Sequence, residues 1–417
     1  MGGFLILRKD HGEPVLVETS ASALRVFEKK GLKKSRHVQR PDFDLHLYQK
    51  LINPDEHFVE FDDGGFVAST GALVYRQKSG TDALVNVYED FKEGSDVDKE
   101  LLGNYCVILY HQRTLTLFND RTGYFRVYHD LDYRVISSSF LAVSHALPVL
   151  TVSPHELYEY IFYGFFLKTK TLFEQVRTLD HDYIWRVTPD RDQKQRAVHF
   201  EDFPAGANFE SMLEMVRENL LEYFRTLGKA FGGSFTCALS GGYDSRLMVA
   251  LLRRLKFDTH IYVYGSEQSD DVRVAKEVAK GERFSLDHVD KKARPPIPME
   301  KWLDHLEKDF YFFDGVKPVG IFDNGSDMDT RLVRARRGRL QLNGAGGEIY
   351  REIWNLPNHD VSVQGWVRNM YDFGEYGACT DIFSKAEFFE KLAAKVRDIL
   401  KISRNRISRR EVEMLFP

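Results

Sequence analysis

The sequence predicts a two-domain α/β protein, with an N-terminal sandwich of antiparallel sheets followed by a C-terminal doubly wound parallel sheet. Three observations support this prediction. The chain has 417 residues, which is more than twice the length of a typical domain of about 150 residues. Short apolar or alternating runs, separated by turn residues, fill the first 150 residues, as in packed antiparallel sheets. After residue 206 the pattern alternates helix and strand, which is typical of a parallel sheet.

Residues 1–200 are expected to form the first domain. Apolar or alternating runs predict strands at Gly3–Leu7, Pro14–Glu18, Phe58–Phe61, Leu73–Arg76, Leu84–Tyr88, Tyr105–Tyr110, Leu115–Asn119, Tyr124–His129 and Tyr133–Ser137. Helices are predicted at Asp44–Ile52, Phe140–Ala146 and Pro154–Phe166. Ser153 before Pro154 marks the start of the last helix, because serine caps helices and proline fits their first turn.

Residues 206–417 are expected to form the second domain, after a polar linker near residues 195–206. Helices are predicted at Phe209–Lys229, Ser245–Leu255, Asp271–Ala279, Met299–Phe310 and Asp329–Arg336, and strands at Ser234–Leu239, Thr259–Tyr264 and Arg339–Asn343. The chain stops at Glu411–Pro417, in the middle of an amphipathic pattern. We therefore expect this domain to be incomplete at its C-terminus.

Composition excludes several classes of protein. Lys and Arg total 58 against 62 Asp and Glu, a net charge of −4, so no electrostatic argument favours a nucleic-acid binder. The three cysteines are too few and too scattered for a disulfide framework or a zinc site. No apolar run approaches the roughly 20 residues of a membrane span, and the N-terminus lacks the basic segment of a signal peptide. We expect a cytoplasmic protein whose partners are neither nucleic acid nor membrane.

The segment Phe235–Leu252 (FTCALSGGYDSRLMVALL) places a glycine-rich turn between a buried strand and a helix. Small residues let the backbone approach a ligand, and the N–H groups and dipole of the helix face it. Ser240 and Ser245 can add hydroxyl donors. Asp244 would repel a bare phosphate, so its presence implies a divalent cation that bridges it to the phosphates. The turn therefore predicts a site for a metal-bound phosphate.

Two common phosphate-binding loops do not fit this turn. It is not a Walker loop, because Gly-x-x-x-x-Gly-Lys-Ser/Thr is absent. Nor does it fit the dinucleotide fingerprint, which needs three glycines and no central acid. A Gly-Gly turn capped by Ser240, with no ligand at all, stays open as the alternative.

Ser-Gly-Gly-x-Asp-Ser after a strand resembles the pyrophosphate loop of N-type ATP pyrophosphatases. Further segments resemble the asparagine synthetase-like amide ligases. Val263–Gly265 and Asp271–Ala279 are similar to that family's second strand–helix unit, and Leu342–Glu348 is similar to its third motif. The resemblance implies a C-terminal ATP pyrophosphatase domain that cleaves ATP to AMP and pyrophosphate.

The N-terminal half resembles the glutaminase domain joined to these ligases. The segments that carry the likeness are Leu102–Tyr105, Phe118–Gly123 and Ser137–Ser139. The resemblance implies a sandwich of the Ntn-hydrolase type. Glutamine-using relatives have a nucleophilic cysteine at position 2, where this chain has Gly2, which has no nucleophilic atom. Cys106 cannot replace it, because it lies in an apolar run and is expected in the core. We therefore expect an inactive glutaminase domain.

The third motif also departs from the family. Ala345 stands where asparagine synthetases have glutamate and β-lactam-forming relatives have tyrosine, so a base for the incoming amine is missing. Glu348 stands where relatives have aspartate and could still reach Mg²⁺. The alternative for Glu348 is an acid that stabilises a helix start through the helix dipole.

The resemblance implies an ATP- and Mg²⁺-dependent ligase that activates a carboxylate as an acyl-adenylate for attack by an amine. Asp244 and Glu348 would be the catalytic residues and would hold the metal. The remaining nucleotide contacts are expected from Ala238, Leu239, Ser240, Gly241, Gly242, Ser245, Val263, Tyr264, Gly344 and Gly346. The partners would be a small-molecule carboxylate and an amine, with a homodimer possible in principle.

Three other functions stay open. The first is a specialised natural-product or peptide macrolactam cyclase of the same family. The second is a thiolating enzyme with the same loop, although such enzymes ordinarily show reactive cysteines or a nucleic-acid-binding face. The third is a nucleotide-binding protein without catalysis, which the loss of functional groups at Gly2 and Ala345 would allow.

Overall fold

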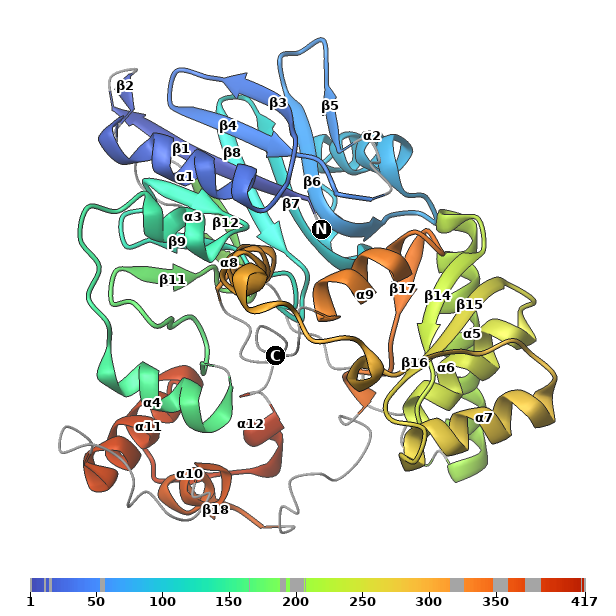
Figure 1. Cartoon of the computed structure of the whole chain (residues 1–417). Helices are drawn as coiled ribbons and strands as arrows, with labels where there is room; N and C mark the ends of the chain where they lie inside the picture. The colour runs from blue at the N-terminus through green and yellow to red at the C-terminus, as the bar shows by residue number, and fades with distance from the viewer. Residues whose placement is uncertain are drawn as a thin grey trace.

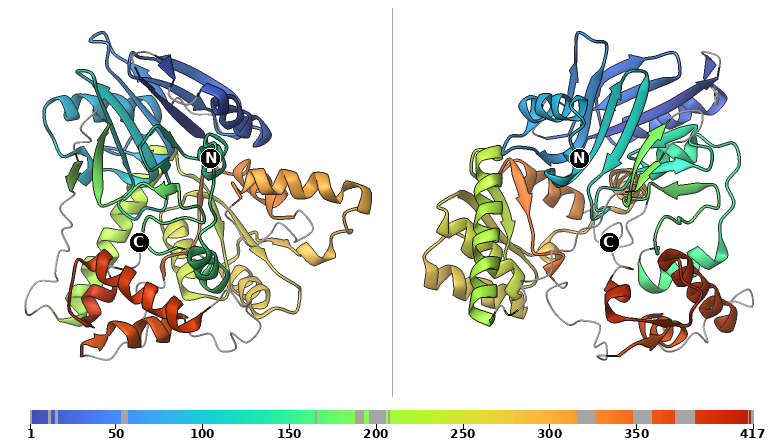
Figure 2. Two further views of the ribbon diagram at one scale, coloured as in Figure 1. Left: turned by 90° about the vertical axis from the view of Figure 1, so that its left-hand side faces the viewer. Right: turned by 180° about the vertical axis from the view of Figure 1, so that it is seen from behind.

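The computed structural model describes residues 2–10, 13–14, 17–52, 57–164, 166–187, 193–195, 206, 208–315, 326–347, 359–371, 384–413 and 415. Within these ranges the chain forms two large antiparallel sheets, one parallel sheet, and a cluster of C-terminal helices with one short antiparallel pair of strands (Figure 1). The antiparallel sheets lie at the top of the view, with the parallel sheet and the C-terminal helices below them on opposite sides (Figures 1 and 2). The predicted combination of antiparallel and parallel sheets is confirmed.

The two antiparallel sheets pack face to face. The first has the order β11-β9-β10-β1-β4-β3, with β2 paired to β1. Its strands are β1 (Gly3–Asp10), β2 (Glu13–Pro14), β3 (Lys34–Gln39), β4 (Phe43–Tyr48), β9 (Tyr128–Asp130), β10 (Val135–Ser137) and β11 (Val176–Thr178). The second has the order β13-β12-β8-β7-β6-β5. Its strands are β5 (Phe58–Glu60), β6 (Phe66–Val74), β7 (Leu102–His111), β8 (Thr114–Asn119), β12 (Tyr183–Val187) and β13 (Gln193–Gln195).

Alternation along the strands builds three hydrophobic layers. Phe4 and Ile6 of β1 face Cys106 and Ile108 of β7 in the layer between the sheets. The other face of the first sheet packs on α1 (Val17–Lys29) and α3 (Phe140–His145). The other face of the second sheet packs on α2 (Gly80–Lys92). The sandwich is therefore a four-layer α-β-β-α unit, because each sheet buries both of its faces. Cys106 lies in the core, as predicted.

Three predictions in this half are wrong. Residues 44–48 of the segment expected as helix Asp44–Ile52 lie in β4, because Phe43, Leu45 and Leu47 alternate into the core between the sheets. The segment expected as strand Leu84–Tyr88 lies in α2, whose buried residues Ala83, Leu84, Val87 and Tyr88 share one face of a helix. The expected strand Pro14–Glu18 is divided between the end of β2 and the start of α1.

The parallel sheet has the order β16-β15-β14-β17, with every pairing parallel. Its strands are β14 (Ser234–Ala238), β15 (Asp258–Tyr264), β16 (Asp287–Val289) and β17 (Leu340–Leu342). One face packs on α5 (Phe209–Phe231), α6 (Tyr243–Arg254) and α7 (Asp270–Glu282). The other face carries Tyr262 and Tyr264, over which Arg334 of α9 (Ser326–Ala335) stacks. Helices therefore lie against both faces of this parallel sheet.

The C-terminal helices pack on a helix from the first half of the chain. They are α10 (Val363–Tyr371), α11 (Lys385–Leu400) and α12 (Arg409–Glu413), with a short pairing of β18 (Val361–Ser362) and β19 (Arg406–Ile407). Their hydrophobic cluster includes Tyr158, Phe162 and Tyr163 of α4 (Pro154–Tyr163). Helix α4 starts with Ser153 in the cap position and proline in its first turn, as predicted. The figures show α4 beside α11, away from the sandwich (Figures 1 and 2).

The remaining helices are α8 (Trp302–Phe312) and three short 3₁₀ helices, Val97–Lys99, Lys291–Ala293 and Met299–Lys301. Contacts join the sandwich to the second half of the chain. Val74 lies in the hydrophobic cluster of the parallel sheet, and Lys30 Nζ pairs with Asp314 Oδ1 at 2.7 Å. No helix within the described ranges is long and apolar enough to cross a membrane. The predicted linker near residues 195–206 falls almost entirely outside the described residues.

Candidate functional site

The candidate site lies where the strand order of the parallel sheet reverses. Following the chain, β15 is added beside β14, and β16 is added beside β15. The next strand, β17, then pairs with the opposite side of β14. In open α/β sheets, ligands bind outside the carboxyl ends of the strands at such a switch point. The loops that follow β14 and β17, residues 239–242 and 343–347, therefore start at this edge side by side.

The two loops touch through glycines. A Cβ atom on Gly344 would lie 2.9 Å from the backbone nitrogen of Ser245, and one on Gly347 would lie 2.7 Å from Asp244 Oδ1. Neither position accepts a side chain without displacing the start of α6. The structure therefore brings together two segments, Ser240–Ser245 and Gly344–Gly347, that are far apart in the sequence.

The loop after β17 is a tight turn. The N–H of Gly347 donates to the carbonyl of Gly344 at 3.2 Å, and Gly346 has a φ of 91°. This is the pattern of a type II turn, which requires glycine at its third residue. Ala345 occupies the second residue and is exposed, so only a methyl group stands where relatives are expected to have a base. Glu348, the other predicted metal ligand, lies outside the described residues.

Hydrogen bonds to nearby side chains hold the loop after β14 in place. The N–H of Ser240 donates to Ser245 Oγ at 2.9 Å, and the N–H of Gly242 donates to Ser240 Oγ at 3.2 Å. The N–H of Gly241 donates to Asp271 Oδ1 at 2.7 Å. Three N–H groups that were expected to face a ligand are thus bonded to side-chain oxygens. They hold the shape of the loop, and other groups must meet the ligand.

Asp271 belongs to the segment that resembles the family's second strand–helix unit, but the sequence pattern assigned it no role of its own. It lies in the first turn of α7, after β15. Helices that follow neighbouring parallel strands begin at the same edge of the sheet. An acid in the first turn of α7 was therefore the sequence feature that could have placed Asp271 at the site. Its charge also suits the positive end of the α7 dipole.

The start of α6 is the part of the site that can receive an anion. Its N-cap residue is Gly242, which offers no side-chain oxygen to the first-turn N–H groups. Such groups, together with the helix dipole, favour a phosphate or another anion. The hydroxyls of Ser240 and Ser245 lie 3.0 Å apart beside them, and Ser245 is buried. The geometry therefore suits a phosphate at the tip of α6.

Asp244 occupies the first turn of α6 and packs against Gly347. A carboxylate at an anion site requires a cation between the two negative groups, and oxygen donors suit Mg²⁺. The residues present therefore fit a magnesium-bound phosphate, with Asp244 as its described ligand. Because this is a single carboxylate, the metal would keep several waters or phosphate oxygens.

The residues expected to contact the nucleotide base lie on the strands beside the loops and at the ends of those strands. The N–H of Leu239 donates to the carbonyl of Tyr262 at 2.8 Å, and the side chains of Leu239 and Val263 are buried in the core of the sheet. Their side chains therefore face the core of the sheet and not a ligand. Ala238 and Tyr264 are partly buried, and Arg334 lies 5.1 Å from the ring centroid of Tyr264.

The start of β1, where glutamine-using relatives are expected to have their cysteine, is closed to side chains. A Cβ atom on Gly2 would lie 2.6 Å from the carbonyl oxygen of Tyr48 and 3.2 Å from the nitrogen of Lys50. Real Cβ atoms do not approach a backbone oxygen that closely. Position 2 therefore lacks a nucleophile, and the surrounding backbone also leaves no space for a side chain there.

We expect Gly2→Cys to release no ammonia from glutamine, since the new thiol can be accommodated only by moving the start of β1. The measurement is ammonia production from glutamine, with N-terminal methionine removal confirmed by mass spectrometry. Gly2→Ala is the matched control, and both variants should show the same small loss of thermal stability. Glutamine-dependent ammonia release by the cysteine variant would contradict the prediction.

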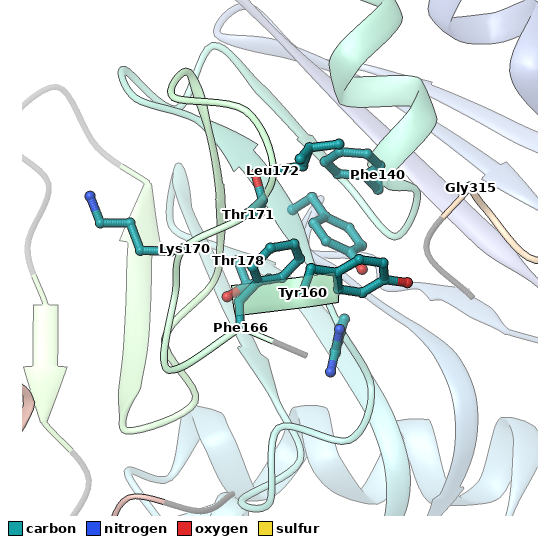
Figure 3. Close-up of a pocket in the computed structure, with 10 residues that line it drawn as sticks. Phe140, Tyr160, Phe166, Lys170, Thr171, Leu172, Thr178 and Gly315 are labelled. Atoms are coloured by element: carbon teal, nitrogen blue, oxygen red, sulfur yellow. The ribbon is translucent and has the colours of Figure 1, made fainter. Parts of the chain in front are cut away.

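A pocket lined mainly by residues of the first half of the chain, together with Gly315, shares no residue with these loops. It is lined by Arg126, Tyr128, Phe140, Tyr160, Phe166, Lys170, Thr171, Leu172, Thr178 and Gly315. Figure 3 shows Phe140, Tyr160 and Phe166 gathered around it, while Lys170 points away. Its described lining includes no carboxylate and no thiol.

A second group of polar side chains lies between α4 and α11. Ligand atoms of His155, Glu156 and Glu159 approach one another within 4.8 Å, a spacing that could suit a metal. Lys395 Nζ, however, already lies 2.6 Å from Glu159 Oε2. Burial lowers the pKa of His155 to about 4. The lysine is therefore the cation of this group, which joins the two helices.

Comparisons with known proteins add little. The sequence matches no protein-family model and no curated protein. Among solved structures, it is similar to the glutamine phosphoribosylpyrophosphate amidotransferase from B. subtilis, at 9% identity and a TM-score of 0.30 over 70% of this chain and 91% of that chain. A second structure, of the allosteric regulatory enzyme of purine biosynthesis, gives 8% identity and a TM-score of 0.29 over 91% and 93%. Likeness this distant carries no argument about fold or function.

Proposed function

We propose that this protein is an ATP-dependent amide-forming ligase of the asparagine synthetase type. The observation that supports it most is the convergence of two glycine-rich loops on Asp244 where the strand order of the parallel sheet reverses. The C-terminal sheet would be the ATP pyrophosphatase domain. The four-layer sandwich would be an Ntn-type glutaminase domain that has lost its nucleophile.

In the proposed reaction, a substrate carboxylate oxygen attacks the α-phosphorus of ATP, and the bond to the bridging oxygen of pyrophosphate breaks. Negative charge builds up on the leaving pyrophosphate. The N–H groups at the start of α6 and the hydroxyl of Ser240 would stabilise that charge. When bound, Mg²⁺ would neutralise further charge there and orient the phosphates.

An amine would then attack the carbonyl carbon of the acyl-adenylate, and AMP would leave. Because the described part of the turn at Ala345 offers no base, the amine must arrive unprotonated or lose its proton to another group. The closed position at Gly2 means that the amine would be ammonia or a substrate amine, and not one released from glutamine by this chain. A peptide macrolactam cyclase would satisfy both conditions.

The proposal is tested by pyrophosphate release from Mg-ATP with a panel of carboxylates that starts with aspartate, each with ammonia, glutamine or no amine. AMP and pyrophosphate formation that depends on a carboxylate would support the ligase. We expect ammonia to yield amide and glutamine to yield none. Failure to bind Mg-ATP would reject the proposal.

One observation favours a second candidate, a nucleotide-binding protein without catalysis. The exposed methyl group of Ala345 leaves the amine side of the site without a functional group among the described residues. Binding of Mg-ATP without pyrophosphate release for any carboxylate would support this candidate over the ligase.

A further inference from the structure

Arg246 lies in the first turn of α6, one turn after Gly242. Its side chain turns back toward the glycine-rich loop, as long side chains on helices tend to do. The Nε–H group donates to the carbonyl of Gly242 at 3.3 Å. The guanidinium carbon lies 4.5 Å from the ring centroid of Tyr243. The side chain is therefore held in place over the start of the helix by two contacts.

Arg246 has no counter-ion in the described part of the chain. Its one described hydrogen bond goes to a backbone carbonyl, and no described carboxylate forms an ion pair with it. Its place on the helix is also unfavourable, because the positive end of the helix dipole repels a cation. By contrast, Arg253 and Arg254 lie in the last turn of α6, where the dipole favours them.

Tyr243, the ring on which Arg246 stacks, is also unusual, because its large side chain is exposed to solvent. Its side chain is 75% exposed, and it is the first residue of α6, directly after the glycine-rich loop. Its ring gives the guanidinium a flat surface, and stacking on an aromatic face fixes the plane of an arginine side chain. The two residues thus form a pre-oriented cation at the place where a phosphate is proposed to bind.

We propose that Arg246 binds the pyrophosphate part of the nucleotide, with Tyr243 as its platform. This inference rests on the proposed function. The guanidinium N–H groups not used by Gly242 can form paired hydrogen bonds to phosphate oxygens. Such a contact supplies the missing counter-ion and offsets the dipole repulsion. In the reaction, Arg246 would stabilise charge on the leaving pyrophosphate without transferring a proton.

The test compares Arg246→Gln, Arg246→Lys and Tyr243→Leu with the unaltered protein. Affinity for inorganic pyrophosphate and for ATP, each with Mg²⁺, is measured by titration calorimetry, and thermal stability is measured without ligand. Arg254→Gln is the matched control, because it removes the same charge from the other end of α6. A hydrogen-bonded charge pair implies that Arg246→Gln weakens binding about 10-fold to 100-fold.

The other variants are expected to differ from Arg246→Gln in how strongly they weaken binding. Arg246→Lys keeps the charge but loses the planar fork, so its affinity should fall between those of the glutamine variant and the unaltered protein. Tyr243→Leu should weaken binding less than Arg246→Gln does. The control should bind like the unaltered protein. Without ligand, Arg246→Gln should not lower the melting temperature, since it removes a cation that the helix dipole repels.

The outcomes separate the inference from the proposed function. Equal affinity of the unaltered protein and Arg246→Gln would overturn the role of Arg246 and leave the ligase proposal standing. A lower melting temperature with unchanged affinity would show that Arg246 only supports the fold. Absence of both pyrophosphate and ATP binding by the unaltered protein would reject the ligase proposal and the inference together.

Discussion

Replacing Asp244 by asparagine is expected to reduce pyrophosphate release at least about 1,000-fold, which corresponds to about 4 kcal/mol of lost transition-state stabilisation. The substitution keeps the size of the side chain, so the packing against Gly347 survives. It removes the charge that would hold Mg²⁺ at the tip of α6. The phosphates would then meet the protein without the cation that offsets their charge.

The experiment measures carboxylate-dependent pyrophosphate release and Mg-ATP affinity for the variant. Asp270→Asn is the matched control. Asp270 also lies in the first turn of a helix at this edge of the sheet, but it is exposed and pairs with Arg273 at 2.7 Å. We expect the control to keep nearly full activity. An Asp244→Asn variant that retained a tenth of the activity would exclude Asp244 as the metal ligand.

Local patterns were enough to predict the parts of this site that are contiguous in the chain. The strand, turn and helix around Ser240–Ser245 follow from a buried run, two glycines and an amphipathic pattern, all within one segment. The close approach of Gly344 and Gly347 to that segment depends on the pairing of β14 with β17. That pairing joins positions about a hundred residues apart, and the sequence suggested it only through resemblance to a family.

Contacts between residues far apart in the chain could not be predicted from the sequence. The hydrogen bond from Gly241 to Asp271 depends on how α7 starts beside the loop. Helix α4 was predicted correctly, yet its packing on α10 and α11 was not, since its aromatic face could equally have packed on the sandwich. The errors at β4 and α2 arose in short apolar segments, where strand and helix patterns are hard to distinguish.

Replacing Lys395 by methionine is expected to destabilise the protein by about 3–5 kcal/mol, because it leaves a buried carboxylate without its partner. Glu159 on α4 is fully buried, and its side chain accepts hydrogen bonds from Lys395 Nζ and from the N–H of Leu167, both at 2.6 Å. This contact joins α4 to α11. The measurement is the free energy of unfolding in denaturant.

The pH dependence of this loss of stability tests whether the unpaired carboxylate of Glu159 is its cause. Burial raises the pKa of Glu159 despite the attraction of Lys395, and removing the lysine raises this pKa further. Near pH 4.5, the ordinary value of this carboxyl, it is largely protonated in the folded variant, so the deficit should be smallest there. The deficit should grow, by up to about 1.4 kcal/mol per pH unit, over the pH range in which Glu159 is ionised in the folded unaltered protein but still protonated in the folded variant.

Two further variants complete the argument. Lys391→Met removes a lysine one turn earlier on α11, whose pair with Glu387 is exposed, so its stability should hardly change. Combining Glu159→Gln with Lys395→Met removes the buried charge and keeps an oxygen for the N–H of Leu167. The double variant should therefore recover much of the lost stability, because replacing both partners avoids an unpaired buried charge. A deficit in Lys395→Met that did not depend on pH, and that the double variant shared, would show that the lysine acts through the packing of its aliphatic chain.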